Sequence, residues 1–345
     1  METKIIKISN TTTDIQDIRS TALIIKNGGL VAFPTETVYG LGADATDKTA
    51  AQKIYSAKGR PSDNPLIIHI ADALDAEKYA YTSPLYYKLA KAFMPGPLTV
   101  IMQKKDIIPD EVTGGLDSVA VRCPSHEVAR ALIKEADTAI AAPSANLSGT
   151  PSPTCAEHVI KDMSGRIDAI IDGGECDIGL ESTIVKIIDE DKLVLLRPGA
   201  ITADALSCVC ENVEISPAVV NALKKDERPL SPGMKYRHYA PNAPLVLIDG
   251  AADATTAFFK NAQKEEKCII LCYSEEVADL TPDNVIDIGA RNDLESQAKR
   301  LFSALRKSNT LDAQIIYAHL PPKDGLGLAL YNRMIRAAAH TVKKI

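Results

Sequence analysis

The chain has 345 residues, of which 46% are hydrophobic and 24% are charged, and its formal net charge is −6. This length predicts two domains, because single hydrophobic cores stop growing at about 250–300 residues. The acidic balance argues against broad nonspecific binding of nucleic acid, so any RNA contact should be local and weak. No apolar run reaches the roughly 18–20 residues of a membrane span, and the N-terminus is too polar for a signal peptide. We expect a cytoplasmic protein with no membrane segment, either a monomer or a dimer.

Short β-rich runs alternate with helical patterns over the first 206 residues. Strands are expected at 28–33, 64–70, 98–103, 118–123, 138–144, 167–172, 182–187 and 193–198. A helix is expected from Asp14 to Ile25, and another after Thr154, where Glu157 completes a capping box. The mix predicts an α/β domain at 1–206 built on a large twisted mixed sheet.

The character of the chain changes after residue 206. The stretch 207–242 is rich in proline and has little periodicity, which is typical of a linker. Beyond it, strands expected at 244–249, 267–273, 284–289 and 314–320 alternate with helices near 252–266, 292–308 and 327–340. Regular β-α alternation predicts a smaller, doubly wound Rossmann-like domain at 243–345.

The seven cysteines predict neither a metal site nor disulfide bonds. The close pairs Cys208/Cys210 and Cys268/Cys272 lack the two-residue gap of a zinc or redox motif. Cys268 and Cys272 lie four residues apart in a β-rich run, which places both on one face of a strand, so we interpret them as core residues. No metal ligand from protein side chains is expected.

Complete phosphate-binding glycine motifs are absent from the sequence. Gly40-Leu41-Gly42 and Gly325-Leu326-Gly327 are fragments that, alone, predict turns. The segment 34–42 nevertheless runs from an apolar strand into hydroxyl, carboxylate and phenol groups, beginning with Thr35. Glycines after such groups let the backbone approach a ligand, so this segment either lines a pocket or forms a structural turn.

Two cations follow a predicted helix, one residue apart. Lys58 and Arg60 enter a proline-containing loop with Asn64, ahead of the strand that carries His69. A lysine point charge beside an arginine fork suits a polyphosphate. The alternative is a pair of helix C-terminal cations favoured by the helix dipole.

Two further clusters follow or open apolar strands. Ser144 and Asn146 lie among small residues that can expose backbone N–H groups to an anion, although an Asx or Ser turn explains them equally. The other cluster places polar side chains at strand ends: Arg122, Ser182, Thr183 and Arg197. Arginines at strand ends are often surface ion pairs, so each carries little weight alone.

Together these clusters resemble a known family. The strings GLVAFPTETVYGLGADA, KGRPSDNPLIIHI, PGPLT, SVAVRCP, APSANLSG, GLESTIV and LLRPGAI are similar to the YrdC-like domain of threonylcarbamoyl-AMP synthases. The segment 231–241, SPGMKYRHYAP, resembles the linker of the long, two-domain form, and the α/β unit after it has the expected size and place. The resemblance covers essentially the whole chain.

The resemblance implies a nucleotidyltransferase reaction. L-Threonine, bicarbonate or CO2, and ATP with Mg2+ would condense to threonylcarbamoyl-AMP and pyrophosphate. A separate tRNA threonylcarbamoyl-transferase complex would then modify the adenosine next to the anticodon. Mg2+ would be bound chiefly by phosphate oxygens and water.

The resemblance also implies roles for single residues. Catalysis would rest on Lys58, Arg60 and Ser144. The residues expected around ATP are Lys58, Arg60, Asn64, Ser144, Asn146, Ser152, Arg197 and Tyr236. The residues expected around L-threonine are Thr35, His69, Arg122 and Ser182. Arg122 suits the α-carboxylate because a planar fork matches a planar anion. His69 would either take a proton or only orient the substrate, and no general base is assigned.

The linker is aromatic and basic at SPGMKYRHYAP, where a flexible tether would favour Ser, Gly and Glu, so we expect Tyr236 to lie in a lid over the nucleotide. Two alternatives remain open. One is a carbamoyltransferase that forms carbamoyl adenylate, although the chain has no CxxC pair of the kind found in such proteins. The other is a non-catalytic module that binds double-stranded RNA, which the acidic net charge disfavours.

Overall fold

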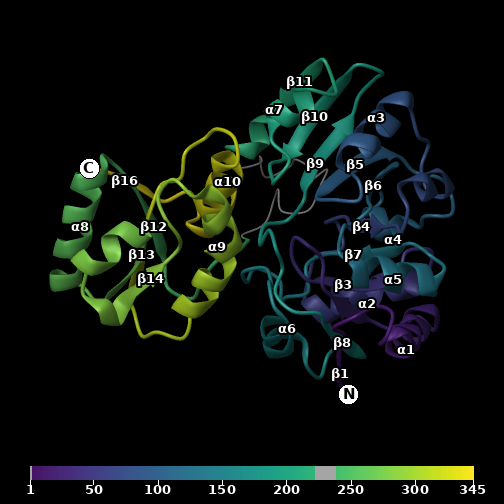
Figure 1. Ribbon diagram of the computed structural model, residues 1–345, viewed down its shortest axis with the longest axis horizontal. Helices are drawn as coiled ribbons and strands as arrows, with labels where there is room; N and C mark the ends of the chain where they lie inside the picture. Colours follow the sequence, from purple (N-terminus) through teal and green to yellow (C-terminus); the bar gives the residue numbers. More distant parts are fainter. Residues whose placement is uncertain (1, 222–237) are drawn as a thin grey trace. The chain divides into compact units, whose positions relative to one another are not determined.

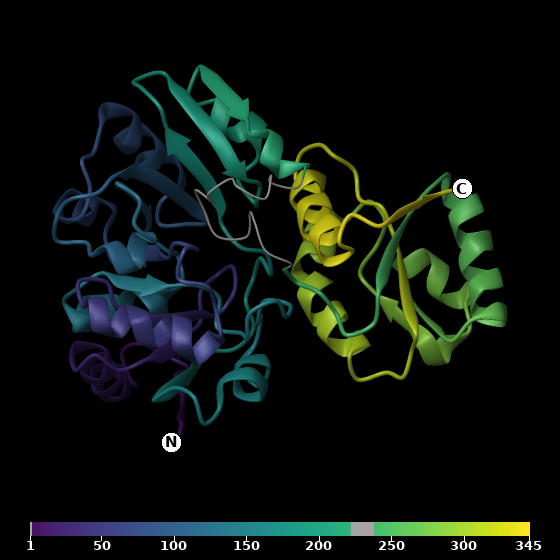
Figure 2. The ribbon, with the colours of Figure 1, turned by 180° about the vertical axis from the view of Figure 1, so that it is seen from behind.

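The computed structural model describes residues 2–221 and 238–345, and Figures 1 and 2 show it from opposite sides. Within the described residues the chain forms two compact units. The first consists of 2–148, 152–177 and 181–221, and the second of 149–151, 178–180 and 238–345. Two short stretches that interrupt the sequence of the first unit therefore belong to the second unit.

The first unit contains a mixed sheet of 11 strands in the order β1-β8-β2-β3-β7-β4-β6-β5-β9-β10-β11. The strands are β1 (Lys4–Lys7), β2 (Val31–Phe33), β3 (Gly40–Asp44), β4 (Ile67–His69), β5 (Leu98–Gln103), β6 (Ser118–Arg122), β7 (Ile140–Ala142), β8 (Ala169–Asp172), β9 (Thr183–Ile187), β10 (Lys192–Arg197) and β11 (Asn212–Ile215). Parallel pairs such as β4/β6 alternate with antiparallel pairs such as β4/β7. The predicted α/β fold with a large mixed sheet is confirmed.

Helices cover both faces of this sheet. The helices are α1 (Ile15–Lys26), α2 (Lys48–Lys58), α3 (Pro84–Phe93), α4 (Asp110–Thr113), α5 (Glu127–Ala136), α6 (Ala156–Met163) and α7 (Ala203–Ser207), with 3-10 turns η1 (Ala73–Lys78) and η2 (Pro217–Val219). Apolar side chains of α1 and α5 pack on one face, around Phe33 and Ile140. Those of α2, α3, α6 and α7 pack on the other face, around Leu41 and Val121. The apolar faces of the helices therefore pack into two hydrophobic cores, one on each face of the sheet.

Strand β3 was not predicted, because we interpreted its glycines as turn residues open to a ligand. Gly40 pairs with Phe33 and Gly42 pairs with Val31 in an antiparallel ladder. A Cβ on Gly42 would lie 2.6 Å from Ile140 Cγ2 and 2.8 Å from the Phe33 ring. The absence of a side chain at these glycines thus leaves room for neighbouring side chains of the core. Our interpretation of the two glycines as turn residues open to a ligand was wrong.

The predicted capping box before α6 was also wrong. The N-cap of α6 is Cys155, which makes no side-chain cap hydrogen bond. Thr154 N instead donates to His158 Nδ1 at 3.3 Å. Helix α1 begins as expected after Asp14, but that carboxylate accepts hydrogen bonds from Ser9 N and Asn10 N rather than from the helix.

The stretch that we interpreted as a linker begins inside the first unit. Strand β11 pairs in parallel with β10 and forms the edge of the large sheet. Its residues, NVEI, are mostly exposed, which is why no apolar periodicity marks them. Residues 222–237 lie outside the described part of the chain.

The second unit contains five parallel strands in the order β14-β13-β15-β12-β16. The strands are β12 (Leu245–Asp249), β13 (Cys268–Cys272), β14 (Val285–Asp287), β15 (Ile315–His319) and β16 (Val342–Lys344). The helices are α8 (Ala252–Glu265), α9 (Leu294–Ser308) and α10 (Gly327–Ala337), with 3-10 turns η3 (Ser274–Asp279) and η4 (Pro282–Asn284). In Figure 1, α8 lies on one side of this sheet and α9 and α10 lie on the other. The doubly wound arrangement is confirmed.

Cys268 and Cys272 are both buried in the hydrophobic core of the second unit, as predicted. In the described ranges 2–221 and 238–345, no helix has the length and apolar character of a membrane span.

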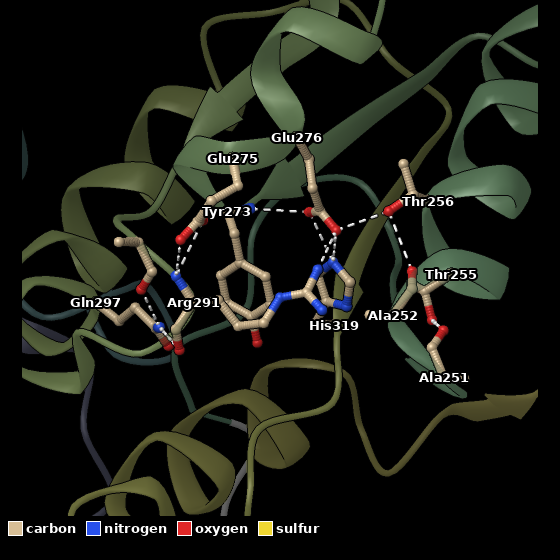
Figure 3. Close-up of polar contacts among 11 residues, drawn as sticks. Ala251, Ala252, Thr255, Thr256, Tyr273, Glu275, Glu276, Arg291, Gln297 and His319 are labelled. Atoms are coloured by element: carbon tan, nitrogen blue, oxygen red, sulfur yellow. Dashed lines mark hydrogen bonds and ion pairs between the residues drawn. The ribbon is translucent and has the colours of Figure 1, made fainter.

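A saturated polar cluster lies at the carboxyl end of β13 and β15 (Figure 3). Both oxygens of buried Glu276 accept hydrogen bonds, and His319 Nε2 lies 2.8 Å from Oε2. Arg291 Nη2 and Thr256 Oγ1 each donate to Oε1 at 2.9 Å, and Tyr273 N donates to Oε2 at 3.1 Å. The Tyr273 ring stacks on His319 with centroids 4.4 Å apart. This network ties η3 to β15 and to the loop before α9.

Replacing Glu276 by glutamine should lower the free energy of unfolding of the protein by about 3 kcal/mol, because the change removes a buried charge around which the half-buried Arg291 and the buried His319 are arranged. Burial alone would raise the pKa of Glu276, but its hydrogen bond and charge interaction with His319 outweigh burial and lower that pKa below its ordinary value of 4.5. The stabilisation is therefore present above about pH 4.5 and is lost as the pH falls through the lowered pKa. Urea titrations at pH 7 and pH 4 measure both effects.

The adjacent, exposed Glu275 provides the control. Glu275→Gln should change the unfolding free energy by less than about 1 kcal/mol. Similar losses in the two variants would show that burial of the carboxylate does not matter.

Candidate active site

Lys58 is the last residue of α2 and is fixed by the loop that follows β7. The helix ends at Gly59, which lies in the left-handed region with φ 63°. Lys58 is 3% exposed, and its Nζ donates to the carbonyl oxygens of Ser144 and Asn146, both at 2.5 Å. Ser144 Oγ donates to Asn146 Oδ1 at 2.6 Å. The structure therefore brings the predicted cation cluster at Lys58 into contact with the predicted cluster of Ser144 and Asn146.

Arg60 and Asn64 lie in the next loop. Arg60 Nη2 donates to the carbonyl oxygens of Asn64 and Pro65 at 3.2 and 3.1 Å, which holds the loop before β4. The Asn64 side chain is buried, and its Oδ1 has no hydrogen-bond partner. This amide oxygen can accept from a ligand or from a rearranged loop.

His69, Arg122 and Thr99 form a row across three neighbouring strands. His69 on β4 is in register with Arg122 on β6, which is in register with Thr99 on β5 (Figure 1). Residues in register on adjacent strands point to the same face. His69 also contacts Phe33 edge to face, so the row lies on the face that carries α1 and α5.

His69 is neutral in the folded protein. Its Nδ1 lies 3.3 Å from the carbonyl oxygen of Ile140. Burial, assisted by the positive charge of Arg122, lowers the pKa of His69 from 6.5 to about 3. A neutral imidazole can accept or donate a hydrogen bond at pH 7, but it adds no positive charge to the site.

The lowered pKa of His69 predicts a pH dependence of stability. Below its ordinary pKa of 6.5 the unfolded chain binds a proton that the folded chain does not bind, down to about pH 3. The contribution of the neutral His69 to the free energy of unfolding is therefore fully present above pH 6.5, and it is lost as the pH falls from 6.5 toward 3. We expect His69→Gln to flatten the decline in melting temperature between pH 6.5 and 4, and parallel declines in both proteins would contradict the assignment.

Arg197 and Ser182 meet at the start of β9. A bulge between Leu195 and Arg197 shifts the register of β10, which places Arg197 opposite Ile184 on the same face as the row above. Arg197 Nη2 donates to Ser182 Oγ at 3.0 Å, and Nε donates to the Ser182 carbonyl at 3.0 Å. Ser182 Oγ in turn lies 2.7 Å from Thr99 Oγ1. Two predicted residues are thus joined to the row through Thr99.

Thr35 forms a tight turn. Its Oγ1 donates to the Val38 carbonyl at 2.6 Å and accepts from the N–H groups of Thr37 and Val38. The next residue, Glu36, is buried, and its Oε1 accepts from Arg122 Nη2 at 2.7 Å. The turn therefore places the Glu36 carboxylate against Arg122, the arginine that we expected to bind the carboxylate of L-threonine.

Ser152 contacts a residue next to Ser182. Its Oγ donates to Glu181 Oε1 at 2.6 Å, and both side chains are buried. Tyr236, which we assigned to the lid, lies outside the described residues.

The predicted residues form two groups at opposite ends of short central strands. In the antiparallel β4/β7 pair, Ala142 is opposite Ile67 and Ile140 is opposite His69. Lys58, Arg60, Asn64 and the Ser144 loop therefore lie at one end of β4, and the row that contains Arg122 lies at the other. Strand β4 has three residues, so its terminal Cα atoms are about 7 Å apart at about 3.3 Å per residue. The turn at Thr35 links the groups, since Gly40 bridges to Ser144 while Glu36 reaches Arg122.

Three buried residues of the site were not assigned from the sequence: Glu36, Thr99 and Glu181. All three lie within the motifs PTET, PGPLT and GLEST; Glu36 and Glu181 each adjoin an assigned residue in the sequence, whereas Thr99 meets the assigned Ser182 only in the fold. The signal that could have found them is the cost of burying polar groups without partners, which makes a polar residue beside an assigned one a candidate partner.

Comparisons with known proteins extend over both units. The family described as "Telomere recombination", which groups Sua5, YciO and YrdC, matches residues 23–199. The family described as "Threonylcarbamoyl-AMP synthase, C-terminal domain" matches residues 201–339.

Relatives with assigned names match the chain over nearly its whole length. A threonylcarbamoyl-AMP synthase of Bacillus subtilis is 44% identical over 333 residues, which cover 96% of this chain and 95% of the relative. One of Pyrococcus abyssi is 44% identical over 337 residues, covering 95% and 96%. The crystal structure of P. abyssi Sua5 complexed with L-threonine is 42% identical, covers 99% of this chain and 100% of that chain, and has a TM-score of 0.91.

Proposed function

Because the chain belongs to the family of the two-domain threonylcarbamoyl-AMP synthases, we propose that it condenses L-threonine, bicarbonate or CO2, and ATP into threonylcarbamoyl-AMP and pyrophosphate. The family makes the protein an enzyme and a transferase. We assign it more finely as a nucleotidyltransferase, since the adenylyl group would move from pyrophosphate to a carbamate. We also propose a cytoplasmic location and delivery of the product to a tRNA-modifying transferase complex.

One observation in the structure supports this function most directly. Two sets of cationic and small polar side chains lie at opposite ends of a three-residue strand, whose terminal Cα atoms are about 7 Å apart. Lys58 and its loop lie at one end, and Arg122 lies at the other. This spacing suits a triphosphate held beside a small amino acid, each with its own positive charge.

We divide the residues between the two substrates accordingly. The nucleotide side would comprise Lys58, Arg60, Asn64, Ser144, Asn146, Ser152 and Arg197. The threonine side would comprise Thr35, His69, Arg122 and Ser182. Arg197 would lie at the boundary, because it also donates to Ser182 Oγ on the threonine side.

The chemistry that this arrangement would perform is a phosphoryl substitution. An oxygen of the threonine carbamate bonds to the α-phosphorus, the bond from that phosphorus to the β-phosphate oxygen breaks, and its electron pair leaves with pyrophosphate. Both reactants are anions, so catalysis depends on holding them in line and neutralising their charge. The neutral His69 would orient substrate at physiological pH rather than supply a positive charge.

Mg2+ would accompany ATP. In the described part of the chain no group of three or more His, Cys, Asp or Glu side chains is arranged to hold a metal ion. The nucleotide side instead offers cations, hydroxyls and amides, which fits a metal held by phosphate oxygens and water. Bound in that way, Mg2+ would neutralise phosphate charge, while Lys58 and Arg60 position the same phosphates.

Release of pyrophosphate that depends on threonine tests the proposal. The protein is incubated with ATP, Mg2+ and bicarbonate, with L-threonine or carbamoyl phosphate as the second substrate. We expect pyrophosphate to be released when threonine is the second substrate and not when carbamoyl phosphate is. Release only with carbamoyl phosphate would indicate the carbamoyltransferase, and no release with tight, salt-sensitive binding of double-stranded RNA would indicate the RNA-binding module.

A further inference from the structure

The buried ion pair between Glu36 and Arg122 is incomplete. Arg122 Nη2 donates to Glu36 Oε1 at 2.7 Å, and the two side chains are 4% and 6% exposed. Glu36 Oε2 and Arg122 Nε are both buried without a hydrogen-bond partner. Leaving a buried polar atom unpartnered costs free energy, and the cost is greater when the group is charged. Each residue therefore retains capacity for one more partner of opposite charge.

The second unit shows how a structural carboxylate is satisfied in this chain. Both oxygens of buried Glu276 have partners, supplied by Thr256, Arg291, His319 and the backbone of Tyr273. Glu36 has one partner on one oxygen. This difference favours a ligand-binding role for Glu36 over a purely structural one.

The charges on the two sides of the pair differ in sign. Glu36 lines a cavity of about 730 Å³ whose other acidic and basic wall residues are Lys7, His126, Glu127, Glu157, Asp172, Glu175 and Asp177. Burial lowers the pKa of His126, so this residue adds little positive charge at neutral pH. On the other side, Arg122 belongs to the row that includes the neutral His69. The Glu36 side therefore favours a cation and the Arg122 side favours an anion.

We propose that Glu36 binds the α-ammonium group of the amino-acid substrate while Arg122 binds its α-carboxylate. This assignment rests on the proposed function. An α-amino acid carries both charges on one carbon, so its zwitterion can lie antiparallel to the guanidinium–carboxylate pair. The last torsion of a glutamate side chain is broad, so Oε2 can turn toward the ligand while Oε1 keeps its contact with Arg122. Arg122 alone would accept many small carboxylates, and Glu36 adds the requirement for an amine.

A ligand comparison tests this assignment. Isothermal titration calorimetry measures the affinity of the full chain for L-threonine and for the 2,3-dihydroxybutanoate of matching configuration, in which a hydroxyl replaces the amine. Glu36→Gln should weaken threonine binding about 10- to 100-fold and the analogue less than about threefold, because only threonine presents an ammonium group. Equal losses for both ligands, or no loss, would overturn the proposal.

Two further variants separate charge from contact. Glu175→Gln removes a carboxylate from the same cavity at an exposed position and should leave both affinities unchanged. Glu36→Asp keeps the charge on a shorter side chain and should retain part of the preference for threonine. If Glu36→Gln does not fold, the test is the ratio of the two affinities in the wild-type protein. The wild type should bind the analogue at least about tenfold more weakly than threonine. Equal binding by the wild type would overturn the assignment.

The proposed function can fail independently of this inference. Wild-type protein that binds threonine with the expected preference but makes no threonylcarbamoyl-AMP would refute the function and leave the Glu36 assignment intact. Normal synthesis without the preference would refute only the assignment.

Discussion

Replacing Lys58 by alanine should lower kcat/KM for ATP by about 100- to 1000-fold, the range seen when one preorganised donor to a developing anion is removed. Lys58 is buried at the end of α2, and its ammonium is fixed by the carbonyl oxygens of Ser144 and Asn146. Its positive charge is therefore already held in place when a phosphate binds next to it. Steady-state kinetics with saturating threonine and bicarbonate measure the effect.

Lys53 provides a matched control for Lys58. It lies on the same helix, is exposed, and donates from Nζ to the Gly28 carbonyl at 2.6 Å, away from the Ser144 loop. Lys53→Ala should change kcat/KM less than about twofold. If Lys58→Ala keeps normal activity, or if both variants lose activity alike, Lys58 has no specific role with phosphate.

Arg122→Lys should lower kcat/KM for threonine by about 10- to 100-fold, mostly through a higher KM. Lysine keeps the charge facing Glu36, so the ion pair is retained in part. It loses the planar fork that binds a carboxylate through one edge while the other edge holds Glu36. Arg122→Ala should in addition lower the unfolding free energy by about 3–5 kcal/mol, because it leaves Glu36 buried and unpaired.

Arg130 is the corresponding control for Arg122. It is in the same unit, on α5, and its Nε donates to the Ala71 carbonyl at 3.1 Å. Arg130→Lys should leave the KM for threonine unchanged. A normal KM in Arg122→Lys would show that this arginine does not contact the substrate carboxylate.

The alternation of apolar runs with helical patterns predicts most of the fold. Strands with β-branched or aliphatic cores, such as LTVIMQ and CIILC, are buried where the pattern places them. Strands β3 and β11 do not follow such a pattern. The glycines of β3 serve close packing against Phe33 and Ile140, and β11 is mostly exposed, so neither carries the apolar signal on which the prediction depends.

The candidate site could be predicted in part. Cations and hydroxyls after apolar strands identified Lys58, Ser144, Arg122 and Ser182 as polar groups at strand ends. Their grouping could not be predicted, because it depends on strand order and on antiparallel pairing, which place Ser144 and Arg122 at opposite ends of the β4 region. The bulge that turns Arg197 toward Ser182 also depends on pairing with β9 rather than on local sequence.

Mass spectrometry of the reaction product tests the central claim most directly. The protein is incubated with ATP, Mg2+, carbon-13 bicarbonate and nitrogen-15 L-threonine, and the mixture is analysed at once for an adenylate that contains both labels. The account predicts one doubly labelled mixed anhydride, which disappears when threonine is omitted and in Lys58→Ala. AMP, or an adenylate that lacks the threonine label, as the only nucleotide product would contradict it.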